Sequence, residues 1–341
     1  MALNSISQLV TIGRHLAEEQ LIHPDATGEF TLILADLAFA IRLIAKEVRR
    51  AGLNDILGMS DSFNYSGDQL RRLDEYANEA IIRTMSYGGH FCAMASEEST
   101  DIIRIPKKYT LGKYVLLFDP VDGSTNIDVN ITIGSIFSIY ERLDPSANND
   151  GTREDVLQPG YKQLAAGYAL YGSSTLFAYT TGNGVNVFTF DPTIGEFLLT
   201  KKNLIMPTWG NHYSCNEGNV FNWNERVRNY LNWIKTPSED KTRPYYMRYI
   251  ATAVGDVHRI LHYGGIYLYP SDSAQPDGKI RLIYEANPLS FIIEQAGGRA
   301  TTGKQRILEI VPDSIHQKTP FFVGSERNIT EFLRFYNGEQ C

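Results

Sequence analysis

Apolar residues recur at helical spacing between residues 27 and 50. The repeat advances in steps of three and four, which is the spacing of one face of an α-helix. Its members are Leu34, Leu37, Ile41, Ile44 and Val48. We therefore predict a long helix with its apolar face in the core. Its first turn would contain Thr27, Gly28 and Glu29, where free backbone N–H groups and the positive end of the helix dipole can hold a phosphate.

A polar loop and a second helix follow. Residues 51–68 are rich in Gly, Ser, Asn and Asp, which predicts a loop, and loops of this length often carry function. Helical spacing resumes from Leu73 to Ile81, and Gly88 with Gly89 ends that helix. Asp74 would lie in its first turn.

Short apolar runs bounded by turn residues predict strands. In the first half these are residues 91–96, 113–118, 131–140 and 163–170, followed by a hairpin with its turn at residues 191–195. In the second half we predict helices near residues 223–234, 250–263 and 288–295 and strands at 266–269 and 280–284. The predicted fold class is therefore α/β, with two sheet-plus-helix domains at residues 1–200 and 201–341.

The composition agrees with a globular protein of two domains. The chain has 341 residues, which is long for a single core, and 43% of them are hydrophobic and 21% charged. The formal net charge is -7 and no long basic run occurs, so nucleic acid is not an expected partner. An anionic substrate would then depend on metal ions or on a few placed Lys and Arg side chains.

The cysteines and the apolar stretches indicate a compartment. Cys92, Cys215 and Cys341 form no CxxC pair, and their odd number predicts neither a disulfide framework nor a zinc cluster. The first thirty residues lack a secretion signal pattern, and no apolar run reaches the length of about 18 residues that a membrane span requires. We expect a cytoplasmic protein that does not bind a membrane.

The most informative segment is Asp119-Pro120-Val121-Asp122-Gly123-Ser124-Thr125-Asn126, which follows an apolar strand. We expect the strand end to fix Asp119, Pro120 to force a turn, and Asp122 to return to the same side. Two carboxylates and a backbone carbonyl would then face one pocket, which suits a hard cation such as Mg²⁺ together with phosphate oxygens. An Asp-Pro turn alone would explain only one of these two acids.

Residues on either side of this acidic pair can complete a phosphate site. Gly123 allows the backbone to approach a ligand, and the N–H groups and hydroxyls of Ser124 and Thr125 can cradle a phosphate. Further acids, Glu97-Glu98 and Glu285, follow two other predicted strands. Acids at three strand ends predict a shared edge of the sheet.

Six segments together resemble class I fructose-1,6-bisphosphatases, over roughly residues 10–335. The segments are Ser96-Glu97-Glu98, residues 119–126, Asn216-Glu217-Gly218, Arg248-Tyr249, residues 265–270 and residues 282–285. The segment 119–126 by itself would specify only the wider lithium-sensitive phosphatase superfamily, which includes inositol monophosphatases. The more distal segments narrow the match.

The resemblance implies a layered α-β-α-β-α sandwich and a gluconeogenic reaction, the hydrolysis of the 1-phosphate of fructose 1,6-bisphosphate to fructose 6-phosphate. It implies two or three Mg²⁺ ions, with Mn²⁺ as a substitute. Their ligands would be Glu97, Asp119, Asp122, Glu285 and the carbonyl of Val121. Glu98 and Asp74 would position and deprotonate the attacking water, and Asp68 would complete the site from the loop.

The same resemblance assigns binding residues and regulation. The sugar and its second phosphate would contact Asn216, Tyr249, Tyr269 and Lys279, and Arg248 would reach the 6-phosphate of a neighbouring subunit's substrate. An inhibitory AMP site would comprise Thr27, Gly28, Glu29, Thr31, Lys113 and Tyr114, in a homotetramer. From the residues alone, packing is the more common role for each of these tyrosines, since the chain has twenty, and Lys279 could equally be a surface lysine of a hairpin.

The chain departs from the family pattern at three positions. Asn219 stands where the family usually has Tyr, Ala253 where it usually has Met, and Glu141 where its AMP site usually has Arg, although Arg142 comes next. A carboxylate at position 141 would repel a nucleotide. His258 and His262 have the spacing of metal ligands on a helix, but no HExxH motif surrounds them, and we interpret them as ordinary helix-face residues.

Two other functions stay open at this point. One is a related phosphatase that acts on sedoheptulose bisphosphate or inositol phosphate, although Arg248, Tyr249 and Lys279 argue against a monophosphate. The other is a regulator that binds a sugar phosphate or nucleotide without turnover. The presence of Glu98 and Asp74, which would activate water, argues against a pure binding protein.

Overall fold

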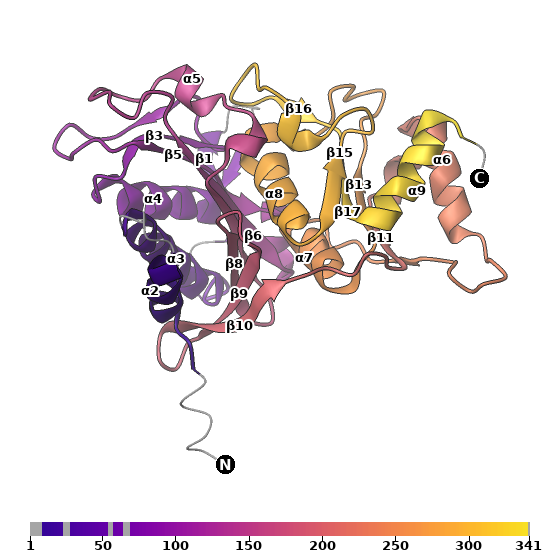
Figure 1. Cartoon of the computed structure of the whole chain (residues 1–341), viewed down its shortest axis with the longest axis horizontal. Helices are drawn as coiled ribbons and strands as arrows, with labels where there is room; N and C mark the ends of the chain where they lie inside the picture. The colour runs from indigo at the N-terminus through magenta and orange to yellow at the C-terminus, as the bar shows by residue number, and fades with distance from the viewer. Residues whose placement is uncertain (1–8, 23–27, 54–56, 64–68, 340–341) are drawn as a thin grey trace, which may run out of the picture.

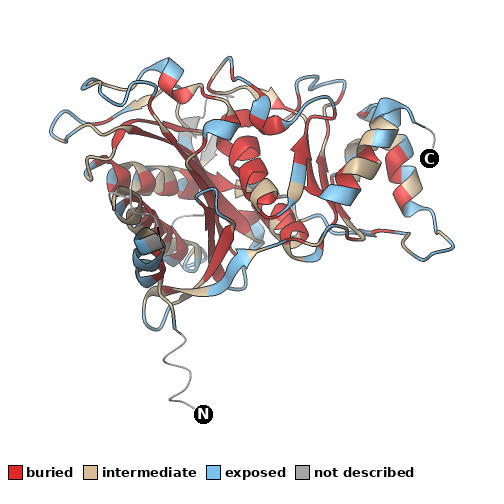
Figure 2. Cartoon of the chain, in the orientation of Figure 1, coloured by how far each residue is buried: buried red, intermediate tan, exposed pale blue. Residues whose placement is uncertain are grey.

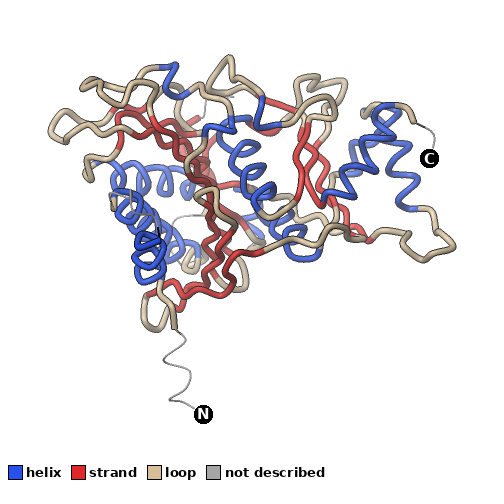
Figure 3. The backbone as a smooth tube through the Cα atoms, viewed as in Figure 1, coloured by secondary structure: helices blue, strands red, loops and turns tan. Residues whose placement is uncertain are grey.

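The computed structural model describes residues 9–22, 28–53, 57–63 and 69–339. These residues form five layers, in the order helices, sheet, helices, sheet, helices (Figure 1). The predicted layered α/β sandwich is thus confirmed. Figure 2 shows buried residues along both sheets and on the helix sides that face them, and Figure 3 shows the loops gathered at the ends of the strands.

The larger sheet has eight strands in the order β10-β9-β8-β7-β6-β5-β3-β4. All neighbours are antiparallel except β3 and β5, which run parallel with Ser96 beside Phe118. The turn predicted at residues 191–195 joins β9 to β10. The strands are β3 (Phe91–Ser96), β4 (Ile103–Arg104), β5 (Tyr114–Asp122), β6 (Ile133–Glu141), β7 (Ala165–Tyr171), β8 (Thr175–Thr180), β9 (Val185–Asp191) and β10 (Glu196–Leu204).

Helices α2 (Ile12–Ile22), α3 (Glu29–Val48) and α4 (Arg72–Ser86) cover one face of this sheet. The predicted apolar stripe of α3 is buried in a core that it shares with alternate strand residues, such as Leu116 and Phe118. The intervening residues, Val115 and Leu117, point to the other face. Because both faces are covered, the central strands are buried along their whole length.

The opposite face packs against the middle helical layer, which consists of α7 (Ala253–Tyr263) and α8 (Asn287–Gln295). On the far side of these helices lies the smaller sheet, in the order β12-β11-β13-β17-β15. Its strands are β11 (His212–Ser214), β12 (Tyr246–Met247), β13 (Ile266–Tyr269), β15 (Gly298–Thr301) and β17 (Phe321–Ser325). Helices α6 (Glu225–Lys235) and α9 (Glu326–Asn337) form the outermost layer.

Four short strands form two separate pairs: β1 (Met59–Phe63) pairs with β2 (Gln69–Arg71), and β14 (Ile280–Arg281) pairs with β16 (Lys318–Thr319). A single helical turn, α5 (Arg153–Val156), lies in the polar excursion that follows β6. In the described part of the chain, no helix combines the length and the apolar character that crossing a bilayer would require.

Two predicted boundaries were wrong, and both concern site residues. Pro120 does not end its strand, because β5 continues to Asp122 through a register irregularity between Asp119 and Asp122. Glu285 does not close a strand either. The strand ends at Arg281, and residues 282–286 form a π-helical turn that leads into α8.

Candidate active site

Three carboxylates converge at the end of the parallel strand pair. Each of Glu97, Asp119 and Glu285 places an oxygen within 4.8 Å of the others. Glu97 follows β3, Asp119 lies on the neighbouring strand β5, and Glu285 reaches them from the π-helical turn before α8. Three buried or half-buried acids at this separation repel one another in the absence of a cation. A set of carboxylate oxygens of this kind fits a hard divalent metal ion.

The electrostatics of the cluster support this fit. Burial raises the pKa of all three carboxyls, and the pKa of Asp119, which is 2% exposed, is raised further by Glu97 and Glu285. Arg281 offsets part of the repulsion, because its guanidinium forms an ion pair with Glu97 and its backbone N–H donates to Glu285 at 2.7 Å. The Oε2 atom of Glu97 is buried without a hydrogen-bond partner among the described residues, so an oxygen is left for a ligand.

Asp122 is held separately, at the N-terminus of α7. Its carboxylate accepts a hydrogen bond from the hydroxyl of Thr252 and from the backbone N–H groups of Ala253, at 3.2 Å, and Val254, at 2.7 Å. Burial raises the pKa of this carboxyl, and the three hydrogen bonds counteract the rise. Asp122 lies close enough to add to the raised pKa of Glu97 and Glu285.

The two acids predicted to handle protons lie beside the cluster. Asp74 is buried in the first turn of α4, where one carboxylate oxygen accepts the N–H of Arg71 at 2.9 Å. Its other oxygen has no hydrogen-bond partner in the part of the chain that the structure describes. Burial raises the pKa of Asp74 to about 7, and Glu97 adds to the rise. Glu98 follows Glu97 directly, and Asp68 lies outside the described residues.

The expected phosphate cradle begins at a left-handed glycine. Gly123 has φ 79° and precedes a 3₁₀ turn over Ser124–Val129. A side chain at this position would be strained, and its Cβ would also come within 2.7 Å of the Cβ of Thr252. The backbone around Ser124 and Thr125 can therefore curve tightly beside Asp122.

The residues expected to contact the sugar lie on several elements. Tyr249 is 37% exposed and Arg248 is also exposed. Tyr269 is partly buried, and burial raises the pKa of its phenol, with the nearby Glu285 and Tyr249 adding to the rise. Asn216 caps a 3₁₀ turn by accepting the N–H of Gly218. Lys279 forms an ion pair with the buried Asp272 at 3.0 Å, so its charge is partly balanced within the protein.

A pocket of about 360 Å³ lies apart from the acidic cluster, at the start of α3. Four of the predicted AMP residues line it: Gly28, Thr31, Lys113 and Tyr114. Glu29 contacts two of these, accepting the hydroxyl of Tyr114 at 3.0 Å and pairing with the ammonium of Lys113 at 3.0 Å. Thr27 lies outside the described residues.

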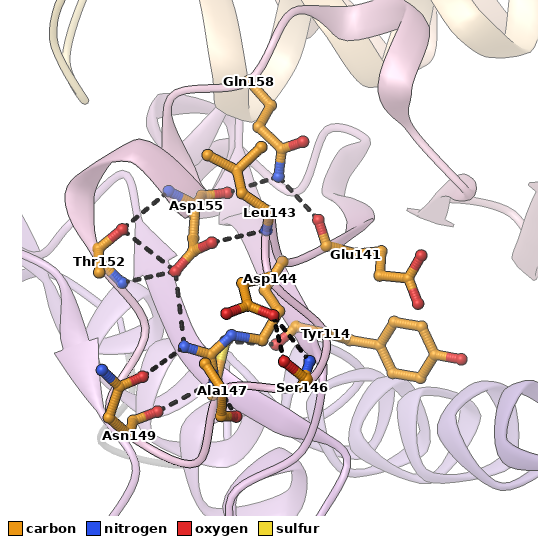
Figure 4. Close-up of polar contacts among 12 residues, drawn as sticks. Tyr114, Glu141, Leu143, Asp144, Ser146, Ala147, Asn149, Thr152, Asp155 and Gln158 are labelled. Carbon is orange, nitrogen blue, oxygen red and sulfur yellow. Dashed lines mark hydrogen bonds and ion pairs between the residues drawn. The ribbon is translucent and has the colours of Figure 1, made fainter.

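Arg142 directly follows the last residue of strand β6. Its guanidinium is 3% exposed and donates to the backbone oxygens of Ala147 and Asn149, with Asp155 at 3.9 Å. It therefore anchors the excursion after β6. Figure 4 shows the side chains of Glu141 and Tyr114 pointing the same way, away from the group around Asp155. At the end of β6, the side chain that lies on the same side as Tyr114 is therefore the carboxylate of Glu141.

Comparisons with known proteins place the chain in a family. Residues 10–202 match the model of the fructose-1,6-bisphosphatase N-terminal domain, and residues 206–337 match that of the C-terminal domain. The chain belongs to the fructose-1,6-bisphosphatase family. Members of this family depend on metal ions, which agrees with the acidic cluster.

Individual relatives match over nearly the whole length. The chain is 51% identical to fructose-1,6-bisphosphatase class 1 of Chlorobium chlorochromatii over 98% of its length and 100% of the relative's. It is 47% identical to the class 1 protein of Nitratidesulfovibrio vulgaris, over 96% of the chain and 98% of the relative. The crystal structure of Leishmania major fructose-1,6-bisphosphatase in holo form superposes with a TM-score of 0.89 at 36% identity, covering 96% of this chain and 99% of that one.

Thr252 and Arg281 shape the site in this family member but were not predicted from the sequence. Thr252 holds Asp122, although the two are 130 positions apart. Its signal in the sequence was weak but present, because a Thr directly before a predicted helix is a favoured N-cap. Arg281 pairs with Glu97 from a position that looked like one residue of an alternating strand, and nothing local in the sequence distinguishes it.

Proposed function

We propose that this chain is a metal-dependent fructose-1,6-bisphosphatase that hydrolyses the 1-phosphate of fructose 1,6-bisphosphate to fructose 6-phosphate and inorganic phosphate. The observation that carries the proposal is the convergence of Glu97, Asp119 and Glu285 at one point of a full-length member of this family. Three buried or half-buried carboxylates that repel one another would destabilise the fold, and the single ion pair of Glu97 with Arg281 offsets only part of that cost, which favours a bound cation over a purely structural role.

We assign the metal to Mg²⁺, bound as two or three ions, with Mn²⁺ as a substitute. Oxygen-only ligands support this choice over metals that favour nitrogen or sulfur. The ligands would be Glu97, Asp119, Asp122, Glu285 and the carbonyl of Val121. When bound, such ions neutralise phosphoryl oxygens and lower the pKa of a nearby water.

The protein's own groups would orient and deprotonate the attacking water. Glu98 and Asp74 are the candidates, with Asp68 completing the site. A carboxyl whose pKa lies near 7, as for Asp74, can accept a proton at neutral pH and release it again. The N–H groups and hydroxyls of Ser124 and Thr125, following Gly123, would hold the phosphoryl group that is transferred.

The remaining residues would select a bisphosphate. Tyr249, Tyr269 and Asn216 offer neutral hydrogen-bonding groups for the sugar. Lys279 offers a cation for the second phosphate, although Asp272 already balances part of its charge. Arg248 would serve a neighbouring subunit's substrate. Its surroundings support such an interface, because the neighbouring Tyr246 and Met247 expose apolar surface. We propose a homotetramer, which a molar mass measured by sedimentation would confirm or reject.

AMP is the proposed regulator, bound in the pocket at the start of α3. The ammonium of Lys113 suits a phosphate, whereas Glu29 and Glu141 work against it. We therefore expect weaker inhibition by AMP than a pocket with an Arg at position 141 would give.

Phosphate release tests the proposed function. The wild-type protein should release phosphate from fructose 1,6-bisphosphate when Mg²⁺ is present and stop when the metal is chelated. Fructose 6-phosphate and inositol 1-phosphate should not be hydrolysed at a comparable rate. Faster release from sedoheptulose 1,7-bisphosphate would reassign the substrate, and an inositol phosphate preference would move the protein to another branch of the superfamily.

One variant separates turnover from binding. Glu98→Gln keeps the size and most hydrogen bonds of the side chain but removes its basicity. We expect kcat to fall by about a hundredfold or more, in the range that general base catalysis contributes, while fructose 1,6-bisphosphate still binds. A protein that binds the bisphosphate and never releases phosphate under any metal would instead be a non-catalytic regulator.

A further inference from the structure

A short segment joins the two sides of the site. Residues 249–254 run from Tyr249, on the sugar side, to the backbone N–H groups that hold Asp122, on the metal side. Each end carries a group with a proposed role, so the conformation of the segment sets the distance between Tyr249 and Asp122. What holds its middle therefore matters for both sides.

Hydrogen bonds hold the two peptide groups that flank Ile250 in the middle of the segment. The N–H of Ile250 donates to both carboxylate oxygens of Asp256, at 3.0 and 3.2 Å. Its carbonyl accepts the side-chain amide of Asn126 at 2.9 Å, and the same amide donates to the carbonyl of Thr132 at 3.1 Å. Asn126 belongs to the acidic segment 119–126, so the clamp ties residue 250 to the backbone that carries Asp119 and Asp122.

The conformation held in this way is an unfavourable one. Ala251 has φ 65°, in the left-handed region that residues with a Cβ seldom occupy. Such a conformation persists only where the surroundings impose it. Asp256 is fully buried in the first turn of α7 and turns its carboxylate back onto the segment. Asp256 lies near Tyr249 as well, since its charge adds to the raised pKa of that phenol.

We propose that Asp256 is a positioning residue for the sugar side of the active site, acting through the Ile250 peptide. Its carboxylate accepts the N–H of Ile250 and acts on the site through that peptide group. Its effect is to hold residues 249–251 in the strained form that presents Tyr249 at a set distance from Asp122. The inference rests on the proposed function, in which Tyr249 binds the sugar.

The test compares two buried carboxylates that differ in where they point. Asp256→Ala removes the acceptor of the Ile250 N–H. Asp155→Ala is the matched control, because Asp155 is also buried in the first turn of a helix and accepts backbone N–H groups, from Leu143 at 2.7 Å and Thr152 at 2.8 Å, far from the sugar side. Thermal unfolding is measured for both. Binding of fructose 6-phosphate to the metal-free proteins is measured by calorimetry, and KM and kcat with Mg²⁺.

We expect Asp256→Ala to weaken fructose 6-phosphate binding by about tenfold, the upper range for losing one net hydrogen bond, and to raise KM more than it lowers kcat. Asp256→Asn keeps one acceptor oxygen and should recover most of the affinity. Asp155→Ala should bind the sugar phosphate as the wild type does, although it melts earlier.

Two results would overturn the inference: a folded Asp256→Ala protein with wild-type affinity for fructose 6-phosphate, or an equal loss of affinity in Asp155→Ala. If Asp256→Ala does not fold, Asn126→Ala addresses the other side of the same peptide and should show the same loss. Failure of the proposed function would look different, because the wild type itself would then release no phosphate from fructose 1,6-bisphosphate.

Discussion

Replacing Thr252 by Val tests how the metal site is held. Valine has nearly the same shape as threonine but lacks the hydroxyl, and position 252 is buried, so the backbone is expected to stay in place. Asp122 then loses one of its three hydrogen bonds and keeps the N–H groups of Ala253 and Val254. Removing a hydrogen-bond partner from a metal ligand typically costs about 10- to 100-fold in metal affinity or activity.

We place the expected effect of Thr252→Val near the lower end of that range, about tenfold, because two of three donors remain. The measurement is the Mg²⁺ concentration that gives half-maximal phosphate release from fructose 1,6-bisphosphate. Thr252→Ser restores the hydroxyl and should return this concentration close to the wild-type value. Thr252 also caps α7, but its hydroxyl lies 3.5 Å from the N–H of Gly255, so the lost cap should lower stability by about 1 kcal/mol at most.

A Thr252→Val protein with unchanged Mg²⁺ dependence would refute the reasoning, since Asp122 would then need no support from α7 or would not bind the metal at all. An equal shift in Thr252→Ser would also contradict it, because the hydroxyl would not be the group that matters.

Two further changes probe other parts of the molecule. Burial, and to a smaller extent the neighbouring His262, lowers the pKa of His258 to about 3 in the folded protein. In the unfolded chain the same imidazole keeps its usual pKa of about 6.5 and is protonated below that pH. Lowering the pH from 7 to 5 should therefore reduce the free energy of unfolding by about 2 kcal/mol. His258→Gln, which can still accept the hydroxyl of Tyr168, should lack this loss in guanidinium unfolding, and an identical pH dependence in both proteins would contradict the assignment. Glu141→Arg exchanges a carboxylate for a guanidinium near Lys113 and should lower the AMP concentration for half inhibition by about tenfold. An unchanged value would mean that AMP does not bind in the pocket at the start of α3.

Much of the fold was predictable because its apolar patterns are long. The stripe from Leu34 to Val48 could belong only to a helix, and the strand at residues 91–96 was predicted at its observed bounds. The run 280–284 was misassigned because a short apolar run fits a strand or a buried helical turn equally well. Helix α9 was not predicted, and neither were strands β15 and β17, whose pairing partners lie elsewhere in the chain.

Some residues of the candidate site could likewise be predicted from the sequence, and others could not. The segment 119–126 carries enough chemistry in eight residues to predict two acids and a phosphate cradle, and Glu97 with Asp119 does meet as parallel strand ends should. Thr252 and Arg281 act through contacts that bridge distant parts of the chain. No local pattern reports such contacts, so only the folded arrangement shows them.

The cluster draws its carboxylates from both halves of the sequence. Glu97 and Asp119 come from the eight-stranded sheet, and Glu285 from the turn that leads into α8. Neither half of the sequence alone carries all three, so an ion bound there would tie the turn before α8 to the ends of the parallel strands β3 and β5. Because only the folded arrangement brings the three carboxylates together, a bound ion would stabilise it, and chelation should lower the melting temperature of the whole molecule. A chain in which either half is misfolded would lack part of the ligand set and would be unable to retain its metal.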